Sequence, residues 1–401
     1  MTYQKNFDVM TKPIQIYLDS SDFSILSNVQ KHPTEYKEVL EYLTRKRNDG
    51  VITMHFSEAH VIEAAPTSPD AIPAAMERFR IIKKLCGKNC LIHPIDLWDI
   101  ELSHQNLDPN NRKKVVRNDG NWMPKLFDLS EMIPDVEKML VDDLKNLGRA
   151  KRRIYLKNGK PTALAYADRS SSYLGGTEEL SRQLPLNIGA LNVVGKYFIG
   201  KATRAQALNA LQGCFADLEE FGRWYKKNWS AASDLSQHLR SSGNEFKNKL
   251  LEARDKLDNL MKEGIASGSS PEKLQGLFKQ TFIESLPANS NQTINKNTKA
   301  SDGIVDLWKT EPGMTCTVTL AMHVARRSVL GASPRTPSHS DFPDCYHAVY
   351  LPYVDIYRPD SFMESVLKEC KMPFSTAIVE KLLKLPSAID KIILERKDSV
   401  N

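Results

Sequence analysis

The most informative segment of this 401-residue chain is Ser340-Asp-Phe-Pro-Asp-Cys-Tyr-His-Ala-Val-Tyr-Leu-Pro-Tyr-Val-Asp-Ile-Tyr-Arg-Pro-Asp360. It predicts a helix that begins near Asp341, then a strand over Tyr353 to Tyr357, with Asp360 shortly after the strand. Asp341 and Asp344 lie one helical turn apart, so they share a helix face. In open α/β sheets, ligands bind outside the carboxyl ends of the strands, where these acids would lie.

The N-terminal part of the chain repeats this succession of strand, acid and helix. Ile14 to Leu18 predicts a strand that ends at Asp19, and Val51 to Met54 predicts a second strand. Ser57 then opens a helix through Ala64, with Glu58 in its first turn. A third strand is expected at Cys90 to Ile92, and the resulting order of strands and helices is typical of a parallel sheet flanked by helices.

The middle of the chain, residues 106–302, shows helical periodicity with few strand signals. Strands and helices alternate again over residues 303–401, with a last strand predicted at Ile389 to Leu394. Either end alone has too few strands for a closed core. We therefore expect residues 1–105 and 303–401 to form one α/β domain, interrupted by an all-α insertion.

Acidic residues follow several of the predicted strands and would gather at one sheet edge: Asp19, Glu58, Asp341, Asp344 and Asp360. Taken alone, each of these acids is better explained as an ordinary helix cap than as a catalytic residue. Ser361 and Glu364 have capping-box spacing, which would free Asp360 from that role. Because clustered carboxylates repel one another unless a cation neutralises them, their convergence favours a site for Mg²⁺ or Mn²⁺.

These segments resemble the PIN-like domain of metal-dependent nucleases. Ile16-Tyr-Leu-Asp-Ser-Ser-Asp22 is similar to the opening motif of that family, and His55-Phe-Ser-Glu-Ala-His60 to its glutamate segment. The segment from Ser340 to Asp360 is similar to its second half. The resemblance implies a three-layer fold with a central parallel sheet. It also implies that Asp19, Glu58, Asp344 and Asp360 hold the metal, with Asp341 as an additional acid.

The resemblance implies a nuclease that hydrolyses phosphodiester bonds, with RNA favoured over single-stranded DNA and endonucleolytic cleavage expected. Water would be the nucleophile, so no serine or cysteine nucleophile is required. At the family level, such nucleases are associated with toxins and phage defence. The alternative is a catalytically silent PIN-like scaffold that binds nucleic acid, a protein partner or a second copy through the helical insertion.

A basic run lies inside the predicted insertion, and no acid interrupts it between Asp143 and Asp168. Such a run suits phosphate backbones, although many charge runs are simply solvated surface, and the sequence leaves both readings open. The residues predicted to bind nucleic acid are Lys145, Arg149, Lys151, Arg152, Arg153 and Lys157.

The composition excludes several other classes of protein. Hydrophobic residues at 41% and charged residues at 26% are ordinary for a globular chain, and the formal net charge is +6. The six cysteines show no zinc-finger spacing, and no Walker-type phosphate loop or HExxH motif occurs. The sequence lacks a signal-peptide pattern and an apolar stretch long enough to span a membrane, so we expect a cytoplasmic protein without membrane contact.

Overall fold

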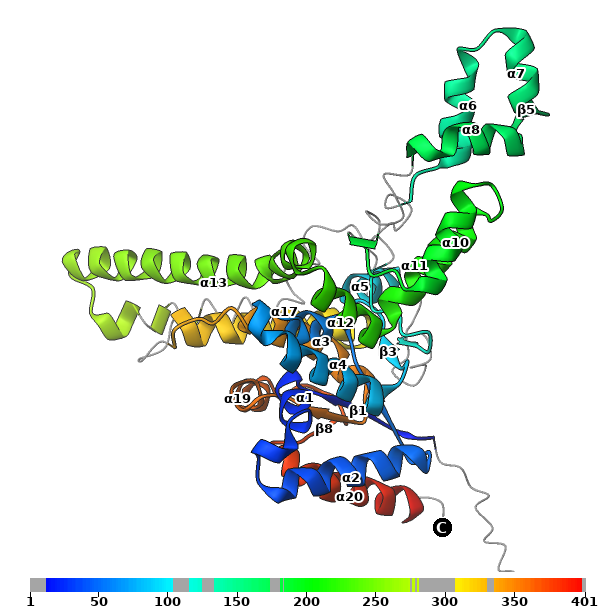
Figure 1. Cartoon of the computed structure of the whole chain (residues 1–401). Helices are drawn as coiled ribbons and strands as arrows, with labels where there is room; N and C mark the ends of the chain where they lie inside the picture. Colours follow the sequence, from blue (N-terminus) through cyan, green and yellow to red (C-terminus); the bar gives the residue numbers. More distant parts are fainter. Residues whose placement is uncertain are drawn as a thin grey trace, which may run out of the picture.

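A computed structural model describes residues 12–103, 115–124, 133–173, 181–182, 184–274, 276–277, 280, 307–329 and 335–398 (Figure 1). Its centre is a four-stranded sheet in the order β2-β1-β7-β8, in which every strand pair is parallel. The strands are β1 (Ile14–Leu18), β2 (Ile52–His55), β7 (Ile356–Arg358) and β8 (Ala377–Ile378). The two ends of the chain therefore build one sheet, which confirms the predicted α/β class with a parallel sheet.

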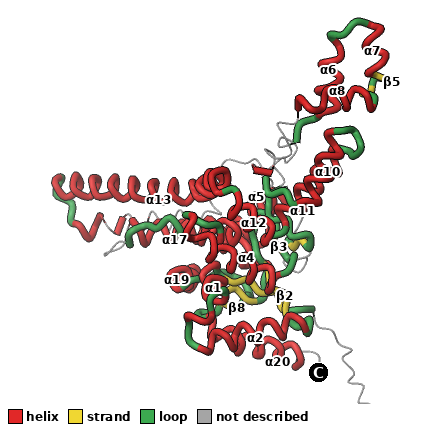
Figure 2. Tube along the Cα trace, viewed as in Figure 1, coloured by secondary structure: helices red, strands yellow, loops and turns green. Residues whose placement is uncertain are grey.

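The middle strand β1 shows why the sheet is buried on both sides. Ile16 pairs with Met54 of β2 on one side and with Ile356 of β7 on the other. Because side chains alternate along a strand, Ile16 and Leu18 enter one hydrophobic core and Tyr17 enters a second. The sheet thus lies between two layers of helices (Figure 2).

The helices of the two chain ends divide between these cores. The first core includes side chains of α1 (Ser20–Leu26), α2 (Thr34–Asn48), α3 (Glu58–Ala64), α4 (Ile72–Cys86) and α20 (Leu385–Asp398). The second includes side chains of α5 (Pro94–Leu102), α17 (Pro312–Val329), α18 (Asp341–His347), the 3-10 helix η5 (Ala348–Tyr353) and α19 (Ser361–Cys370). Short 3-10 helices occur at η1 (Val29–Lys31), η2 (Pro69–Ala71) and η6 (Leu382–Lys384), and α16 covers Leu307–Thr310.

Three strand predictions need correction. The run from Ile389 to Leu394 lies inside helix α20, where Leu385 and Ile389 are buried one helical turn apart. The strand expected from Tyr353 begins only at Ile356, because the preceding residues form η5. The predicted third strand, β3 (Cys90–Leu91), joins the sheet only by one parallel bridge from Cys90 to Phe56, and pairs antiparallel with β4 (Val116–Arg117).

The described part of the predicted insertion is mostly helical, as expected. Its helices are α6 (Val136–Lys145), α7 (Arg149–Tyr155), α8 (Ala163–Tyr173), α10 (Ile188–Phe198), α11 (Arg204–Ala216), α12 (Leu218–Lys227) and α13 (Trp229–Ala266). A small hairpin joins β5 (Leu156–Lys157) to β6 (Lys160–Pro161). Asp217 separates α11 from α12, since its carboxylate accepts the backbone N–H of Glu219 at 3.1 Å and caps the second helix.

The insertion shares a hydrophobic core with the N-terminal helices. The ring of Phe221 on α12 packs edge-on against Phe79 of α4, with 5.9 Å between ring centroids. A Cβ atom on Gly222 would stand 2.9 Å from the Phe79 ring, so the close approach of these helices depends on glycine. Phe79, Trp122 and Phe221 therefore belong to one continuous cluster. In the described part of the chain, no helix is both long and apolar enough to cross a bilayer.

Candidate functional site

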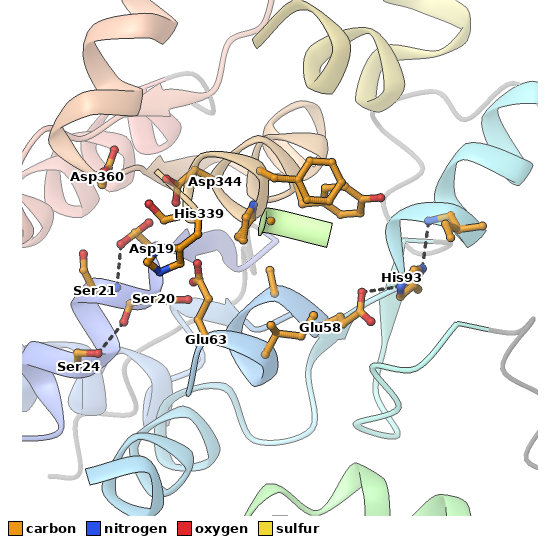
Figure 3. A pocket seen from close by; sticks show the side chains of 18 residues that line it. Asp19, Ser20, Ser21, Ser24, Glu58, Glu63, His93, His339, Asp344 and Asp360 are labelled. Carbon is orange, nitrogen blue, oxygen red and sulfur yellow. Dashed lines mark hydrogen bonds and ion pairs between the residues drawn. The ribbon is translucent and has the colours of Figure 1, made fainter. Parts of the chain in front are cut away.

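A cavity of about 570 Å³ opens beside the ends of β1 and β2, and acidic side chains form much of its wall (Figure 3). Asp19 follows β1, Glu58 and Glu63 lie on α3, Asp344 lies on α18, and Asp360 precedes α19. The fold thus brings four of the five predicted acids, and one that was not predicted, to the same hollow. Their placement follows from the parallel sheet, which collects strand ends at one edge.

Two of the aspartates cap helices as well as lining the cavity. Asp19 Oδ1 accepts the backbone N–H of Ser21 at 2.7 Å, and Asp360 Oδ1 accepts that of Met363 at 2.6 Å. The capping box predicted for Ser361 and Glu364 is therefore wrong, because Asp360 itself is the cap. In both caps the bond goes to Oδ1, so capping and cation binding by the same carboxylate are compatible.

Asp344 differs from the two capping aspartates. It is 7% exposed, and no described residue donates a hydrogen bond to its carboxylate. Burial raises the pKa of Asp344 well above its ordinary value, and the nearby charges of Glu63, Asp19 and Asp360 raise it further. The pKa of Asp360 is raised as well, by burial and by Asp19. The cavity therefore holds a group of carboxylates that oppose one another's ionisation.

Glu63, and not Glu58, is the glutamate that lies with the aspartates. Figure 3 shows Glu63 beside Asp19 and Asp344, whereas Glu58 points toward His93 at the other end of the cavity. The Glu58 Oε2 and His93 Nε2 atoms are 2.5 Å apart. Glu63 comes four residues after Ala59 and shares the helix face of that residue, but only the structure shows that this face lines the cavity.

Asp341 has a structural partner that the sequence did not reveal. Both of its oxygens lie 2.7 Å from Nη1 of Arg335, and Oδ2 also accepts the backbone N–H of Ser338 at 2.9 Å. The residue is fully buried. Among the described residues that line the cavity, Asp341 does not appear, so this acid fixes the loop before α18 and is not a wall residue.

A buried hydrogen-bond network supports Glu63 from behind. Nε2 of His347 is 3.1 Å from Glu63 Oε2, and Nδ1 of His347 is 2.6 Å from the Tyr17 hydroxyl. The Tyr17 hydroxyl is also 2.6 Å from Ser57 Oγ. Burial alone would lower the pKa of His347, but the hydrogen bond and charge of Glu63 outweigh it and raise that pKa. Sequence analysis did not identify this role, because Tyr17 and Glu63 come from segments far from His347 in the chain.

The far end of the network is a neutral histidine. His60 Nδ1 accepts the backbone N–H of Ser57 at 3.0 Å, so the ring proton is assigned to Nε2, which donates to the carbonyl of Leu18 at 2.8 Å. Burial lowers the pKa of His60 well below its ordinary value. His60 therefore ties α3 to the end of β1, which fixes the position of Glu63 relative to Asp19.

The carboxylates are ligands of the type that hard cations prefer, but they are not arranged as a metal site. Among the described residues, no group of three or more His, Cys, Asp or Glu side chains stands close enough together to hold a metal ion. Asp344 nevertheless lies buried among like charges without a donor to its carboxylate. Oxygen-rich, negatively charged walls of this kind suit Mg²⁺ or Mn²⁺.

The predicted nucleic-acid-binding run lies elsewhere. Residues 136–173 form an arm of α6, α7 and α8 that projects from the body beyond α10 (Figure 1). Nη2 of Arg152 donates to the carbonyls of Lys145 and Leu147 at 2.6 and 3.1 Å, so Arg152 caps the end of α6. All six predicted cations are exposed: Lys145, Arg149, Lys151, Arg152, Arg153 and Lys157. The structure places them on the arm and not on the cavity wall.

Comparisons with protein-family models, with curated proteins and with solved structures find no match for this chain.

Proposed function

We propose that the chain is a metal-dependent nuclease of PIN-like type that hydrolyses phosphodiester bonds, with RNA preferred over single-stranded DNA. The observation that carries the proposal is the gathering of Asp19, Glu63, Asp344 and Asp360 on the wall of one cavity. Burial and the charges of the other three raise the pKa of Asp344, as expected for carboxylates that lie close together. Repulsion among carboxylates lowers the stability of the fold at neutral pH, unless a bound cation neutralises it. A divalent cation bound among the carboxylates would replace their mutual repulsion with attraction to the ion.

Asp19, Glu63, Asp344 and Asp360 are the residues that would hold Mg²⁺ or Mn²⁺ in this proposal. Glu63 replaces Glu58 in the set that the sequence favoured, because Glu63 is the glutamate beside the aspartates. A cation of this kind, when bound, makes water a better nucleophile and stabilises negative charge on a phosphate. Without it, a wall of carboxylates repels a phosphate backbone, so we expect activity to require the metal.

The residues of the chain would contribute position and charge. The helix caps made by Asp19 and Asp360 fix the orientation of their carboxylates. The bond from His347 does the same for Glu63, and Tyr17 holds His347 in place. Such preorganisation lowers the cost of assembling a charged site around its ligand.

The competing function is a catalytically silent scaffold that binds nucleic acid through the exposed cations of the projecting arm. Residues 149–153 include four exposed basic side chains: Arg149, Lys151, Arg152 and Arg153. Both functions predict binding of nucleic acid, and only the nuclease predicts metal-dependent cleavage. The two are therefore separated by a cleavage assay and not by a binding assay.

The test is incubation of the full chain with single-stranded RNA and single-stranded DNA of the same base order, with Mg²⁺, with Mn²⁺ or with EDTA. We expect cleavage of RNA with either metal and none with EDTA. Asp344→Asn and Glu63→Gln should each lower the rate at least about a hundredfold, the scale expected when a group that acts on the transition state is lost. Glu41→Gln is the matched control, because Glu41 is exposed and pairs with Lys37 one turn away on α2.

Cleavage that resists EDTA, or that survives in Asp344→Asn at the wild-type rate, would contradict the proposal. Binding of RNA without cleavage under every metal condition would favour the scaffold.

A further inference from the structure

The end of the cavity opposite the aspartates is aromatic. Phe342 and Tyr346 both line it, and they lie four residues apart on α18, so they share one face of that helix. Their ring centroids are 4.5 Å apart, and both side chains are only partly buried. Asp344, on the same short helix, lines the cavity as well, so α18 contributes to both its aromatic and its acidic parts.

This aromatic wall is held by rings from two other elements. Phe246 of α13 packs against Phe342 with 5.4 Å between centroids, and Trp98 of α5 packs against Tyr346 at 5.7 Å. Gly243 of α13 lines the cavity, where a Cβ atom would stand 2.4 Å from the His339 carbonyl oxygen. The insertion therefore supplies part of the wall of the cavity and fixes Phe342.

Glu58 is the polar group at this end. His93 Nδ1 accepts the backbone N–H of Ile95 at 3.1 Å, so the ring proton is assigned to Nε2 and is donated to Glu58 Oε2. Glu58 and Tyr346 both line the cavity, and the charge of Glu58 adds to burial in raising the pKa of Tyr346. An ionised carboxylate only accepts hydrogen bonds. Glu58 is thus a fixed acceptor next to an aromatic surface.

We propose that Phe342, Tyr346 and Glu58 form a subsite for one unpaired nucleobase that carries an exocyclic amino group. The base would stack on the aromatic wall and donate its amino hydrogen to Glu58, while its phosphate points toward the aspartates. The inference rests on the proposed nuclease function and specifies its substrate as single-stranded. Proteins generally bind unpaired bases by stacking them on aromatic rings, and the carboxylate of Glu58 would add selectivity.

The selectivity follows from base chemistry. Cytosine presents an amino donor where uracil presents a carbonyl acceptor, and the two pyrimidines otherwise have nearly the same size. Opposite Glu58, cytosine would gain a charge-assisted hydrogen bond, whereas uracil would place two acceptors against each other. The subsite should therefore prefer cytosine to uracil, and a cavity of about 570 Å³ is large enough for a nucleotide.

The test measures binding of oligocytidylate and oligouridylate to the full chain by fluorescence anisotropy in Ca²⁺, a hard cation that neutralises the carboxylates. Gel electrophoresis checks that the oligonucleotides stay intact during the measurement. Wild type should bind oligocytidylate at least about fivefold more tightly. Glu58→Gln should remove most of this difference, because an amide can donate to uracil as well as accept from cytosine. Tyr346→Leu should weaken both ligands at least about fivefold, whereas Tyr346→Phe, which keeps the ring, should bind like wild type.

Equal affinity of the wild type for the two oligonucleotides would overturn the inference, as would unchanged binding by a folded Tyr346→Leu variant. Circular dichroism and thermal unfolding check that each variant is folded. Cleavage of the same oligonucleotides in Mn²⁺ separates the two proposals. A cytosine preference without cleavage would overturn only the nuclease. Cleavage without a base preference would overturn only the subsite.

Discussion

At the scale of one residue, Asp344 shows how the other carboxylates of the cavity oppose the ionisation of a buried aspartate. A carboxylate that is buried among other carboxylates is more stable protonated, and its folded pKa rises. In the folded state it then binds a proton more tightly than in the unfolded state. The resulting stabilisation is complete below the ordinary aspartate pKa and is lost as pH rises through the folded pKa. The pKa of Asp360 is also raised, so its contribution to stability is likewise lost as pH rises.

The prediction for Asp344→Asn concerns stability without metal. In EDTA, the unfolding free energy of the wild type should fall as pH rises from about 4, by about 1.4 kcal/mol for each unit of pKa shift. The variant should show a weaker fall and should be at least as stable as wild type near neutrality, because asparagine removes one of the opposing charges. Urea unfolding at a series of pH values measures both. A variant that loses several kcal/mol at neutral pH would show that Asp344 has a structural role.

The residues of the site were predictable where local sequence fixes the geometry. Asp19 and Asp360 each lie between a strand and a helix, so their place at the sheet edge follows from sequence order alone. Glu58 is the first residue of α3, yet its side chain pairs with His93 from a distant segment and not with the aspartates. The long-range bonds of His347 and the partner of Asp341 depend on tertiary packing, and no local pattern encodes them.

Helix α13 shows at the scale of the element that the insertion takes part in the site. Its Gly243 lies against the loop before α18, and Phe246 packs on Phe342. Helical periodicity predicted the element but not its partner. The strand predicted at Ile389 to Leu394 was wrong for a similar reason. A short apolar run fits a strand or a helix face equally well, and packing against the first core makes it helical.

Gly243→Ala should destabilise the protein, because the added methyl group would meet a backbone carbonyl oxygen at 2.4 Å and α13 must move away. We expect a loss of about 1 to 3 kcal/mol, the usual cost of overpacking. Gly213→Ala in α11 is the matched control, since nothing lies within 4 Å of its added Cβ. The control should gain up to about 1 kcal/mol from helix propensity. Thermal unfolding compares the two, and equal responses would contradict the packing described for Gly243.

The projecting arm has its own prediction. Replacing Arg149, Lys151 and Arg153 with Gln should weaken binding of single-stranded RNA and lower the slope of log affinity against log salt by up to about two units. Arg152 is left intact because it caps α6. Turnover at saturating RNA should persist, since the arm lies apart from the cavity wall. A salt slope equal to that of wild type would show that the arm is solvated surface only.

At the scale of the whole molecule, the predicted division into an α/β domain and an insertion describes the order of elements along the chain. It does not describe a boundary in the hydrophobic core. Phe79 of the N-terminal part and Phe221 of the insertion lie in one cluster, and Trp122 Nε1 donates to the carbonyl of Phe215 at 3.0 Å within it. Periodicity reveals which residues face a core, but not whether two segments share it.

Excising residues 106–302 and joining the ends with a Gly/Ser linker should therefore fail to give a native fold. The deletion would expose Phe79 and would remove Phe246 from Phe342. We expect an aggregated or molten product that binds the dye ANS and lacks near-ultraviolet circular dichroism. A soluble product with cooperative unfolding would mean that the α/β part folds alone and that the shared core is dispensable.

The central claim is that Asp19, Glu63, Asp344 and Asp360 form a site for a divalent cation. A crystal structure of the protein soaked in millimolar Mn²⁺, with anomalous data, tests it most directly. We predict an anomalous peak bound by Asp344 and at least one of the other three carboxylates, and no such peak in crystals of Asp344→Asn. Ordered carboxylates with no peak between them in the wild type would contradict the claim.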